Sequence, residues 1–234
     1  MLRGQDKLDE AEPVLREALA IRRARFASSH PAIATSVNNL ADLLLARDDL
    51  AGAEPLFRES LSMRRALYGE RHPAVGIGWI NHAAVLQRID GRRDEAVRSY
   101  DEARAVLVAT VGPGHPLLGA VDGNLGRLYH ESGEHERALD HYRAALAVRR
   151  ESYDASHPLV LGNLSDIGRC LTDLARYPEA ESVLLDAYEG LEPQREQQAR
   201  LLDSVLVRLG TLYRATGRED EAARYDAKRV PRGP

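Results

Sequence analysis

The chain contains 234 residues, of which 44% are hydrophobic, 29% are charged and only 5% are aromatic, and its formal net charge is −4. Acidic side chains outnumber basic ones, which excludes a sequence-wide electrostatic attraction to nucleic acid. No stretch approaches the roughly 18 apolar residues of a membrane helix, and the first residues do not resemble a secretory signal, so we expect a cytoplasmic protein that binds neither nucleic acid nor membrane.

Two landmarks recur along the chain at nearly constant spacing. His-Pro pairs are separated by 42, 43 and 42 residues and begin at His30, His72, His115 and His157. An alanine recurs with the same period, at Ala11, Ala53, Ala96, Ala138, Ala180 and Ala222. The distance from each alanine to the next His-Pro is constant, so we place the extra residue of the second unit in the turn at residues 89–91. A period of about 40 residues predicts a stack of similar units, each packed on its neighbours.

The chain begins inside a unit, at a helix whose partner helix is missing. Apolar side chains spaced by three and four residues predict one amphipathic helix over residues 6–24. We assign residues 5–29 to the unpaired second helix of a truncated unit. Because such a helix leaves an apolar flank uncovered, self-association through uncapped ends is one expectation.

Each full unit then resolves into two helices, called here the first and the second helix. Pro31 suits the first position of a helix, because its φ is already helical and its missing N–H needs no partner there, and His30 is then the cap. Asp49 caps the second helix, which we expect over residues 50–67. Gly69 has the position of a helix-terminating glycine.

Two stretches depart from this pattern. Pro13 and Pro55 lie inside second helices and should either bend them or move the helix start closer to the proline. In the fifth unit Ala199-Arg200 replaces His-Pro, and we expect its first helix to begin early, just after Pro193, with a short polar helix over residues 219–229 as a cap. The expected boundaries of this single array, residues 1–234, are 30–71, 72–114, 115–156 and 157–192, with an atypical repeat and cap at 193–230.

Small residues recur where the two helices of a unit should cross. They are Ala53, Ala96, Ala138 and Ala180 on second helices, and Ala41, Ala83, Gly126, Gly168 and Gly210 on first helices. Only a small side chain permits close approach of two helices. A large residue at such a position should overpack the crossing and cost roughly 1–3 kcal/mol.

The unit resembles the 42-residue tetratricopeptide repeat of the kinesin light chain type, whose pattern is close to H-P-x-x-A-x-x-x-N-N-L-A-x-L, a turn, and A-E-P-L-[FY]. The matching residues of the first full unit are His30-Pro31, Ala34, Asn38-Asn39-Leu40-Ala41, Leu43 and Ala53 to Phe57. The resemblance covers residues 5–229. It implies an all-α fold, a right-handed α-solenoid of stacked antiparallel helix pairs, whose first helices line a concave groove that receives a segment of a partner protein.

Catalytic and metal-binding motifs are absent from the sequence. The regularly spaced histidines belong to units about 10 Å apart, whereas ligands of one zinc ion converge to about 2.1 Å. His82, His130, His135 and His141 form no H-E-x-x-H or comparable pair. The single cysteine, Cys170, lies in an apolar run that predicts a buried, inert thiol. We therefore expect no enzymatic activity, no cofactor and no metal.

Polar residues recur nine positions after each His-Pro histidine and are the best candidates for the groove. An asparagine both donates and accepts hydrogen bonds, so a ladder of them could clamp an extended backbone, although each one could instead bond a neighbouring helix end. The ladder consists of Asn39, Asn81 and Asn124, followed by Asp166 and Arg208. The opposite charges of Asp166 and Arg169 should partly neutralise each other. The predicted peptide-binding residues are Thr35, Asn38, Asn39, Asp42, Ile77, Asn81, Arg88, Asn124, Arg127, Asp166 and Arg169.

Two functional interpretations remain open. The chain is either a peptide-binding adaptor or the sensor region of a larger signalling protein such as a nucleotide-binding switch ATPase, in which long repeats of this type often follow the switch domain. The missing half-unit at the N-terminus favours the second. Binding of a protein or peptide segment is the expected activity in both, and the residues do not identify that partner.

Overall fold

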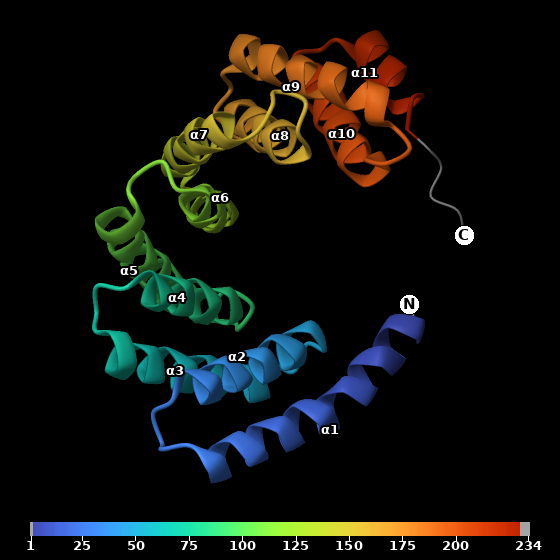
Figure 1. The fold of residues 1–234 in the computed structure, drawn as a ribbon. Coiled ribbons are helices and arrows are strands. Elements are labelled where there is room, and N and C mark those ends of the chain that lie inside the picture. The colour runs from blue at the N-terminus through green and yellow to red at the C-terminus, as the bar shows by residue number, and fades with distance from the viewer. Residues whose placement is uncertain (1, 230–234) are drawn as a thin grey trace. The chain divides into compact units, whose positions relative to one another are not determined.

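The computed structural model describes residues 2–229, with side chains for Leu8 and residues 10–229, and within this range it contains eleven α-helices, one 3₁₀ helix and no strand (Figure 1). The fold is all-α, as the repeat predicts. Contacts divide the chain into two compact units, residues 1–113 and residues 114–234. None of the helices formed by residues 2–229 combines the length and the apolar character needed to cross a lipid bilayer.

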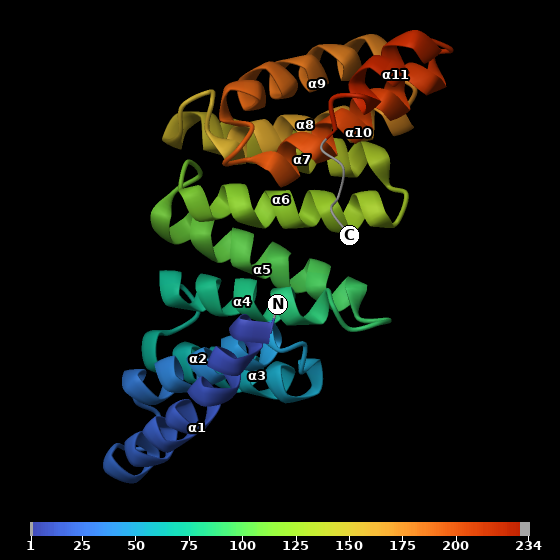
Figure 2. The ribbon, with the colours of Figure 1, turned by 90° about the vertical axis from the view of Figure 1, so that its right-hand side faces the viewer.

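The unit of residues 1–113 is a series of helices in which each contacts the next (Figure 2). The helices are α1 (Leu2–Arg25), α2 (Pro31–Ala46), α3 (Leu50–Tyr68), α4 (Pro73–Leu86) and α5 (Arg93–Val111). α2 pairs with α3 and α4 pairs with α5, while α1 packs against α2. On α1 the side chains of Val14 and Ile21 are 64% and 57% exposed, so this helix keeps an uncovered apolar flank.

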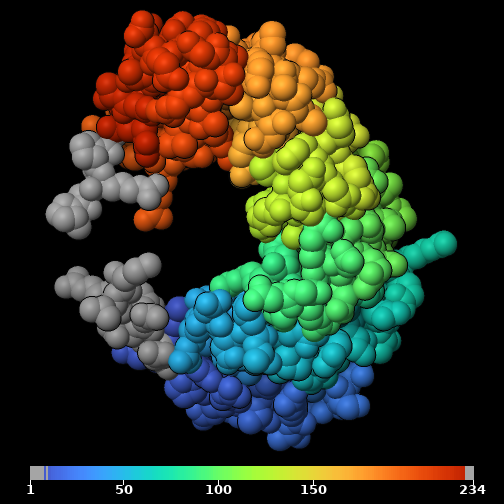
Figure 3. Space-filling view, turned by 180° about the vertical axis from the view of Figure 1, so that it is seen from behind, coloured from blue at the N-terminus to red at the C-terminus, as the bar shows by residue number. Residues whose placement is uncertain are grey.

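The unit of residues 114–234 repeats the same pairing, and its successive helices pack closely in the space-filling view (Figure 3). The helices are α6 (Pro116–Glu131), α7 (His135–Ser152), α8 (Pro158–Asp173), α9 (Tyr177–Leu191), α10 (Ala199–Ala215) and α11 (Glu219–Asp226). The pairs are α6 with α7, α8 with α9 and α10 with α11, and α10 also contacts α8 directly. The first helices α8 and α10 thereby lie next to each other, and a hydrogen bond between His130 and Asp173 links the end of α6 to the end of α8.

The His-Pro pairs start the first helices in the way their chemistry predicts. Each histidine is the extended N-cap of its helix, proline follows it, and its Nδ1 accepts a hydrogen bond from the backbone N–H two residues later. The donor–acceptor distances are 3.1 Å at His30, 3.1 Å at His72, 3.3 Å at His115 and 3.2 Å at His157. Three of these rings also stack on an aromatic ring of the preceding segment: Phe26 on His30, Tyr68 on His72 and Tyr153 on His157.

The small residues lie where helices cross closely, as predicted. Ala53, Ala96, Ala138 and Ala180 are completely buried. A Cβ added to Gly126 would lie 2.7 Å from Cδ1 of Tyr142, and one added to Gly168 would lie 2.6 Å from Cδ2 of Leu184. These distances leave no room for a methyl group, so the crossings depend on the missing side chains.

The prediction of an extra residue in one turn agrees with the structure, whereas the prediction of later starts for the helices that contain proline does not. The turn between α4 and α5 spans residues 87–92, whereas the corresponding turn between α2 and α3 spans only residues 47–49, in agreement with an extra residue near Gly91. By contrast, α3 begins at Leu50 and runs through Pro55, and α1 likewise runs through Pro13. The expected alternative of a later helix start is therefore wrong.

The predicted early start of the fifth unit is also wrong. Glu192–Gln194 forms a 3₁₀ helix, and α10 begins only at Ala199. Long-range contacts hold the intervening segment outside the helix, because Gln194 donates to the carbonyl of Ser156 at 2.8 Å and Arg195 donates to the carbonyl of Lys228 at 3.1 Å. The polar helix α11 follows and buries Tyr225.

Candidate functional site

In the unit of residues 1–113, Asn38 is the centre of a hydrogen-bond network. Its Nδ2 donates to Asp42 at 2.7 Å, and its Oδ1 accepts from Nδ2 of Asn81 at 2.8 Å and from Arg64 at 3.4 Å. Arg64 also donates to the carbonyl of Ala74 at 3.1 Å. The network joins α2, α3 and α4, so two of the predicted peptide-binding asparagines bond each other across neighbouring first helices.

Burial shifts the pKa values of the two charged residues of this network, Asp42 and Arg64. Burial raises the pKa of Asp42, against the opposing effects of the Arg64 charge and the Asn38 hydrogen bond. Burial also lowers the pKa of Arg64, although the nearby Asp42 charge opposes that shift. Two opposite charges that both lose water are held by hydrogen bonds to one amide, which makes the network a structural connection between repeats.

The other predicted residues of this unit lie on its surface. Thr35 donates to the carbonyl of Pro31 in its own helix at 2.9 Å, and Arg88 pairs with Asp48 at 2.6 Å in the turn after α2. Asn39 is exposed and forms no side-chain hydrogen bond with any residue that the structure describes. Ile77 is 37% exposed. Asn39 and Ile77 are therefore the predicted residues that remain open to a ligand here.

In the unit of residues 114–234 the predicted residues are divided between two patterns of contact. Asn124 is half-buried, and Arg127 pairs with Glu131 on its own helix at 2.9 Å. Asp166 forms its ion pair with Arg208 of α10 at 2.9 Å, whereas the sequence predicted Arg169 as its neutralising partner. Arg208 also donates to Oγ of Ser165 at 2.6 Å, so it bridges α8 and α10.

An open cavity of about 520 Å³ lies along α6, α8 and α10. Its lining residues are His130, Arg169, Thr172, Asp173, Arg200, Asp203, Ser204, Val207, Arg208 and Thr211. Only Arg169 of these belongs to the predicted peptide-binding set, although Arg208 was recognised as the fifth member of the ladder. Sequence reasoning missed most of the residues that line this cavity.

The charges around the cavity do not cancel. Arg208 is paired with Asp166, and Asp203 is paired with Arg229 at 2.8 Å. Arg169 donates only a long hydrogen bond, 3.4 Å, to the hydroxyl of Tyr142, and its buried Nε has no partner within the described residues. Arg200 is exposed and has no ion pair in the part of the chain that the structure describes. Two guanidinium groups are thus without an ion pair and available to an anionic group, while the carboxylate of Asp173 on the same cavity wall bonds His130.

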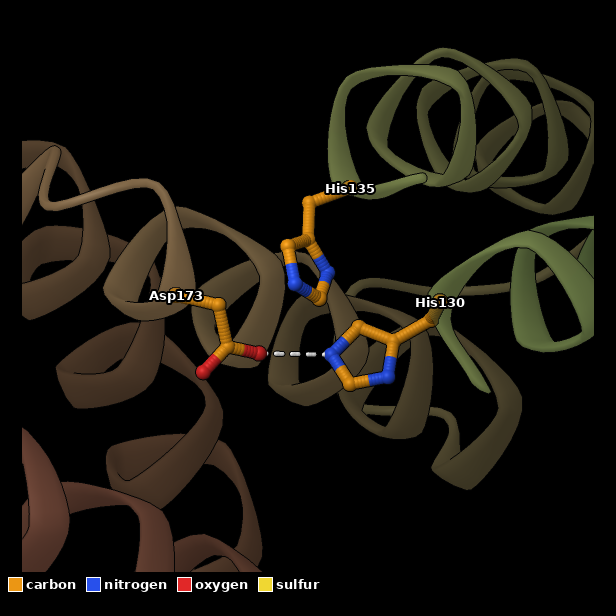
Figure 4. Close-up of side chains that lie close together, drawn as sticks. All are labelled: His130, His135 and Asp173. Atoms are coloured by element: carbon orange, nitrogen blue, oxygen red, sulfur yellow. Dashed lines mark hydrogen bonds and ion pairs between the residues drawn. The ribbon is translucent and has the colours of Figure 1, made fainter. Parts of the chain in front are cut away.

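At one end of the cavity three side chains from α6, α7 and α8 converge (Figure 4). Nε2 of His130 lies 2.6 Å from Oδ2 of Asp173, and the rings of His130 and His135 are 4.9 Å apart. Burial lowers the pKa of His130, although the hydrogen bond to Asp173 acts in the opposite direction. One coordinating atom from each of the three residues lies within 4.8 Å of the others. The sequence predicted no such cluster, because the three residues match no metal-binding motif.

Buried polar groups occur elsewhere without forming a site. His141 bonds the buried carboxylate of Asp122 at 2.9 Å and stacks on Tyr129. Cys170 is fully buried, which confirms the predicted burial, and burial raises the pKa of its thiol to about 12.

Comparisons with known proteins agree with the repeat pattern. Residues 1–66, 74–151 and 120–192 match the tetratricopeptide repeat family. The protein KINESIN LIGHT CHAIN-RELATED 1 of Arabidopsis thaliana is 28% identical over 132 residues, which are 56% of this chain and 22% of that protein, so the chain spans well under half the length of this relative.

Solved structures share the fold at lower sequence identity. BtubC (BKLC) from P. vanneervenii superposes with a TM-score of 0.80 at 21% identity, covering 97% of this chain and 94% of that one. The putative kinesin light chain repeats of Podosopora anserina give a TM-score of 0.68 at 22% identity, covering 83% and 90% of the two chains. The chain belongs to the tetratricopeptide repeat family, and its repeats are similar to those of kinesin light chain-related proteins.

Proposed function

We propose that this chain is a non-catalytic scaffold that binds a segment of a partner protein, and that the cavity along α6, α8 and α10 receives an acidic group of that segment. Proteins built from this repeat are generally protein-interaction scaffolds, and the fold is typically non-catalytic. The observation that carries the proposal is the open cavity of about 520 Å³ with two arginines that lack an ion pair.

The two arginines without an ion pair favour a ligand that carries a carboxylate group. A guanidinium group presents its N–H donors as a planar fork that matches a carboxylate, and such charge-assisted hydrogen bonds are stronger than neutral ones. The buried Nε of Arg169 has no partner among the described residues, and leaving a buried donor unsatisfied costs about 1–3 kcal/mol. Because this Nε is buried, a ligand carboxylate in the cavity would accept from the Nη groups of Arg169. An Asp or Glu side chain, or a C-terminal carboxylate, is therefore the favoured group.

The rest of the cavity wall suits a polypeptide ligand. Ser204 offers a hydroxyl group that both donates and accepts, as an extended backbone requires, whereas the Thr211 hydroxyl donates to the carbonyl of Val207 at 3.0 Å and offers a ligand its acceptor oxygen. Val207 is 38% exposed between them on the same helix and offers apolar contact. The ion pair of Arg208 with Asp166 holds the floor of this surface in place.

The first unit contributes differently. Because Asn38 and Asn81 bond each other, they support the stack of helices, and the remaining groups for a ligand are Asn39 and Ile77. We propose these two as a secondary contact surface. The same surfaces would carry the input signal if the chain were the sensor region of a larger signalling protein.

A peptide array probed with the intact chain tests the proposal. We expect the retained peptides to contain Asp, Glu or a free carboxyl terminus, and to lose at least about tenfold in affinity with Arg169→Gln and Arg200→Gln, since a hydrogen bond to a charged group contributes about 1.5–3 kcal/mol. Arg224→Gln, an exposed arginine on α11, is the matched control and should change nothing. Equal binding by all variants at equal thermal stability would refute the assignment of the cavity.

A further inference from the structure

We propose that His130, His135 and Asp173 form a binding site for a divalent transition-metal cation of the zinc type. The three residues come from different helices of one compact unit, at the end of α6, the first position of α7 and the last position of α8. One coordinating atom from each lies within 4.8 Å of the others. This proposal does not depend on the peptide-binding function.

The donor set points to the class of metal. Two imidazoles and one carboxylate suit Zn²⁺ and its neighbours Co²⁺ and Ni²⁺, whereas Mg²⁺ and Ca²⁺ prefer oxygen ligands alone. Catalytic and regulatory zinc sites commonly use three protein ligands and leave one position open. His130 and Asp173 also line the open cavity, so water or a ligand carboxylate can reach the fourth position.

The geometry requires only side-chain movement. Ligand atoms around a tetrahedral ion with bonds of about 2.1 Å lie roughly 3.4 Å apart. His130 Nε2 and Asp173 Oδ2 are now at a hydrogen-bond distance of 2.6 Å, so the ion would replace the shared proton and separate this pair by about 1 Å. Asp173 is exposed and ends its helix, so its carboxylate is able to rotate without moving the helix.

His135 provides an independent observation. Its Nδ1 is buried and has no hydrogen-bond partner within the described residues. Buried polar atoms are nearly always satisfied, so this ring lacks the partner that normally fixes a histidine in a packed environment. A cation bound through Nδ1 of this ring would supply the missing partner.

The positive charge of Arg169 near the cluster allows the metal site to be tested by substituting a residue that is not a ligand. Arg169 lines the same cavity, and its positive charge opposes a bound cation. Arg169→Gln should therefore tighten metal binding, an effect that a purely structural role of the His130–Asp173 hydrogen bond does not predict.

Titration of the untagged, metal-free chain with Co²⁺ tests the site, followed by displacement with Zn²⁺. We expect one Co²⁺ per chain with the visible absorption of a tetrahedral ion and no thiolate charge-transfer band, because Cys170 is fully buried outside the cluster. Zn²⁺ should remove this absorption and raise the melting temperature, since a cation that binds only the folded state stabilises it.

Variants complete the experiment. His135→Gln and Asp173→Asn should each weaken Co²⁺ binding by at least about 100-fold, because loss of even an outer-shell partner costs 10–100-fold. His157→Asn is the matched control, since it removes a histidine outside the cluster and keeps a capping side chain. Absence of Co²⁺ absorption and of a Zn²⁺-dependent stabilisation in the wild-type chain, or equal binding by the cluster variants and the control, would overturn the proposal. The melting temperatures of the metal-free variants show whether each one folds.

Discussion

The close crossing of α8 and α9 gives a prediction that isolates steric fit from helix propensity. Gly168 and Gly162 both lie within α8. A Cβ at Gly168 would overlap Cγ of the buried Leu184 and lie 2.6 Å from its Cδ2, whereas a Cβ at Gly162 would meet only Leu201, at an ordinary 3.6 Å. Gly168→Ala and Gly162→Ala therefore add the same methyl group to the same helix, at one site with no room for it and at one site with room.

The magnitudes follow from two opposing effects. Alanine is favoured over glycine in a helix interior by about 0.8–1.0 kcal/mol, and both variants gain this contribution. Overpacking a tight core contact costs about 1–3 kcal/mol, and only Gly168→Ala bears this cost. We expect Gly162→Ala to stabilise the protein by about 1 kcal/mol and Gly168→Ala to be neutral or destabilising by up to about 2 kcal/mol.

Urea and thermal unfolding followed by circular dichroism measure this difference. A gap of about 1–3 kcal/mol between the two variants corresponds to roughly 2–12 °C in melting temperature for a chain of this size. Because repeat arrays do not always unfold in two states, the transition midpoints of the two variants are compared directly. Equal midpoints would show that the crossing relaxes at no cost, and the steric explanation of Gly168 would then be wrong.

Three further predictions concern single side chains. The buried Cys170 thiol, with its pKa raised to about 12, should react with a thiol reagent at neutral pH only on unfolding, as absorbance with and without urea would show. Burial lowers the pKa of His82 below its ordinary value of about 6.5, so the unfolded state binds more protons than the folded state. The free energy of unfolding should therefore fall as the pH drops below about 6.5. In His82→Gln, the urea midpoint should depend less strongly on pH between pH 7.5 and pH 5. Asn38→Ala should cost about 1–3 kcal/mol because it leaves the amide of Asn81 without its partner. Asn39→Ala, its exposed neighbour, should stay within about 0.5 kcal/mol of wild type in the same measurement.

Helix starts were predictable wherever the signal is local. Proline at the first position and histidine at the cap act within three residues, and α2, α4, α6 and α8 all begin at the predicted prolines. The fifth first helix has neither signal. Its start at Ala199 depends on contacts of Gln194 and Arg195 with residues more than 30 positions away, which periodicity does not reveal.

The binding site was less predictable, because a repeat pattern says which residues are equivalent and not which ones touch. The spacing correctly grouped Asn39 with Asn81 as equivalent positions, but the structure bonds Asn81 to Asn38. Likewise Asp166 bonds Arg208 of the next first helix and not Arg169, one turn along its own. In both cases the partner lies in the next repeat, so reading along a single helix face missed it.

Most of the contacts between first helices of successive repeats have a sequence separation that differs from the period of 42. Two parallel helices related by a translation present opposite flanks to each other, so equivalent residues point in the same direction and meet only where a side chain is long enough to reach across, as Arg208 reaches Asp166 at a separation of 42. One step along an α-helix rotates a side chain by about 100°, which carries it from one flank toward the other. A separation of one residue more than the repeat is therefore favoured for contacts between successive first helices. Four hydrogen bonds within the two units have a separation of 43, namely Asn38 with Asn81, Leu45 with Arg88, His130 with Asp173 and Ser165 with Arg208.

A search of the sequence at this offset pairs His130 with Asp173, and His135 joins them across the short turn from α6 to α7. The residues of the proposed metal site could thus have been found from the sequence, but only once the packing of the first helices had supplied the offset.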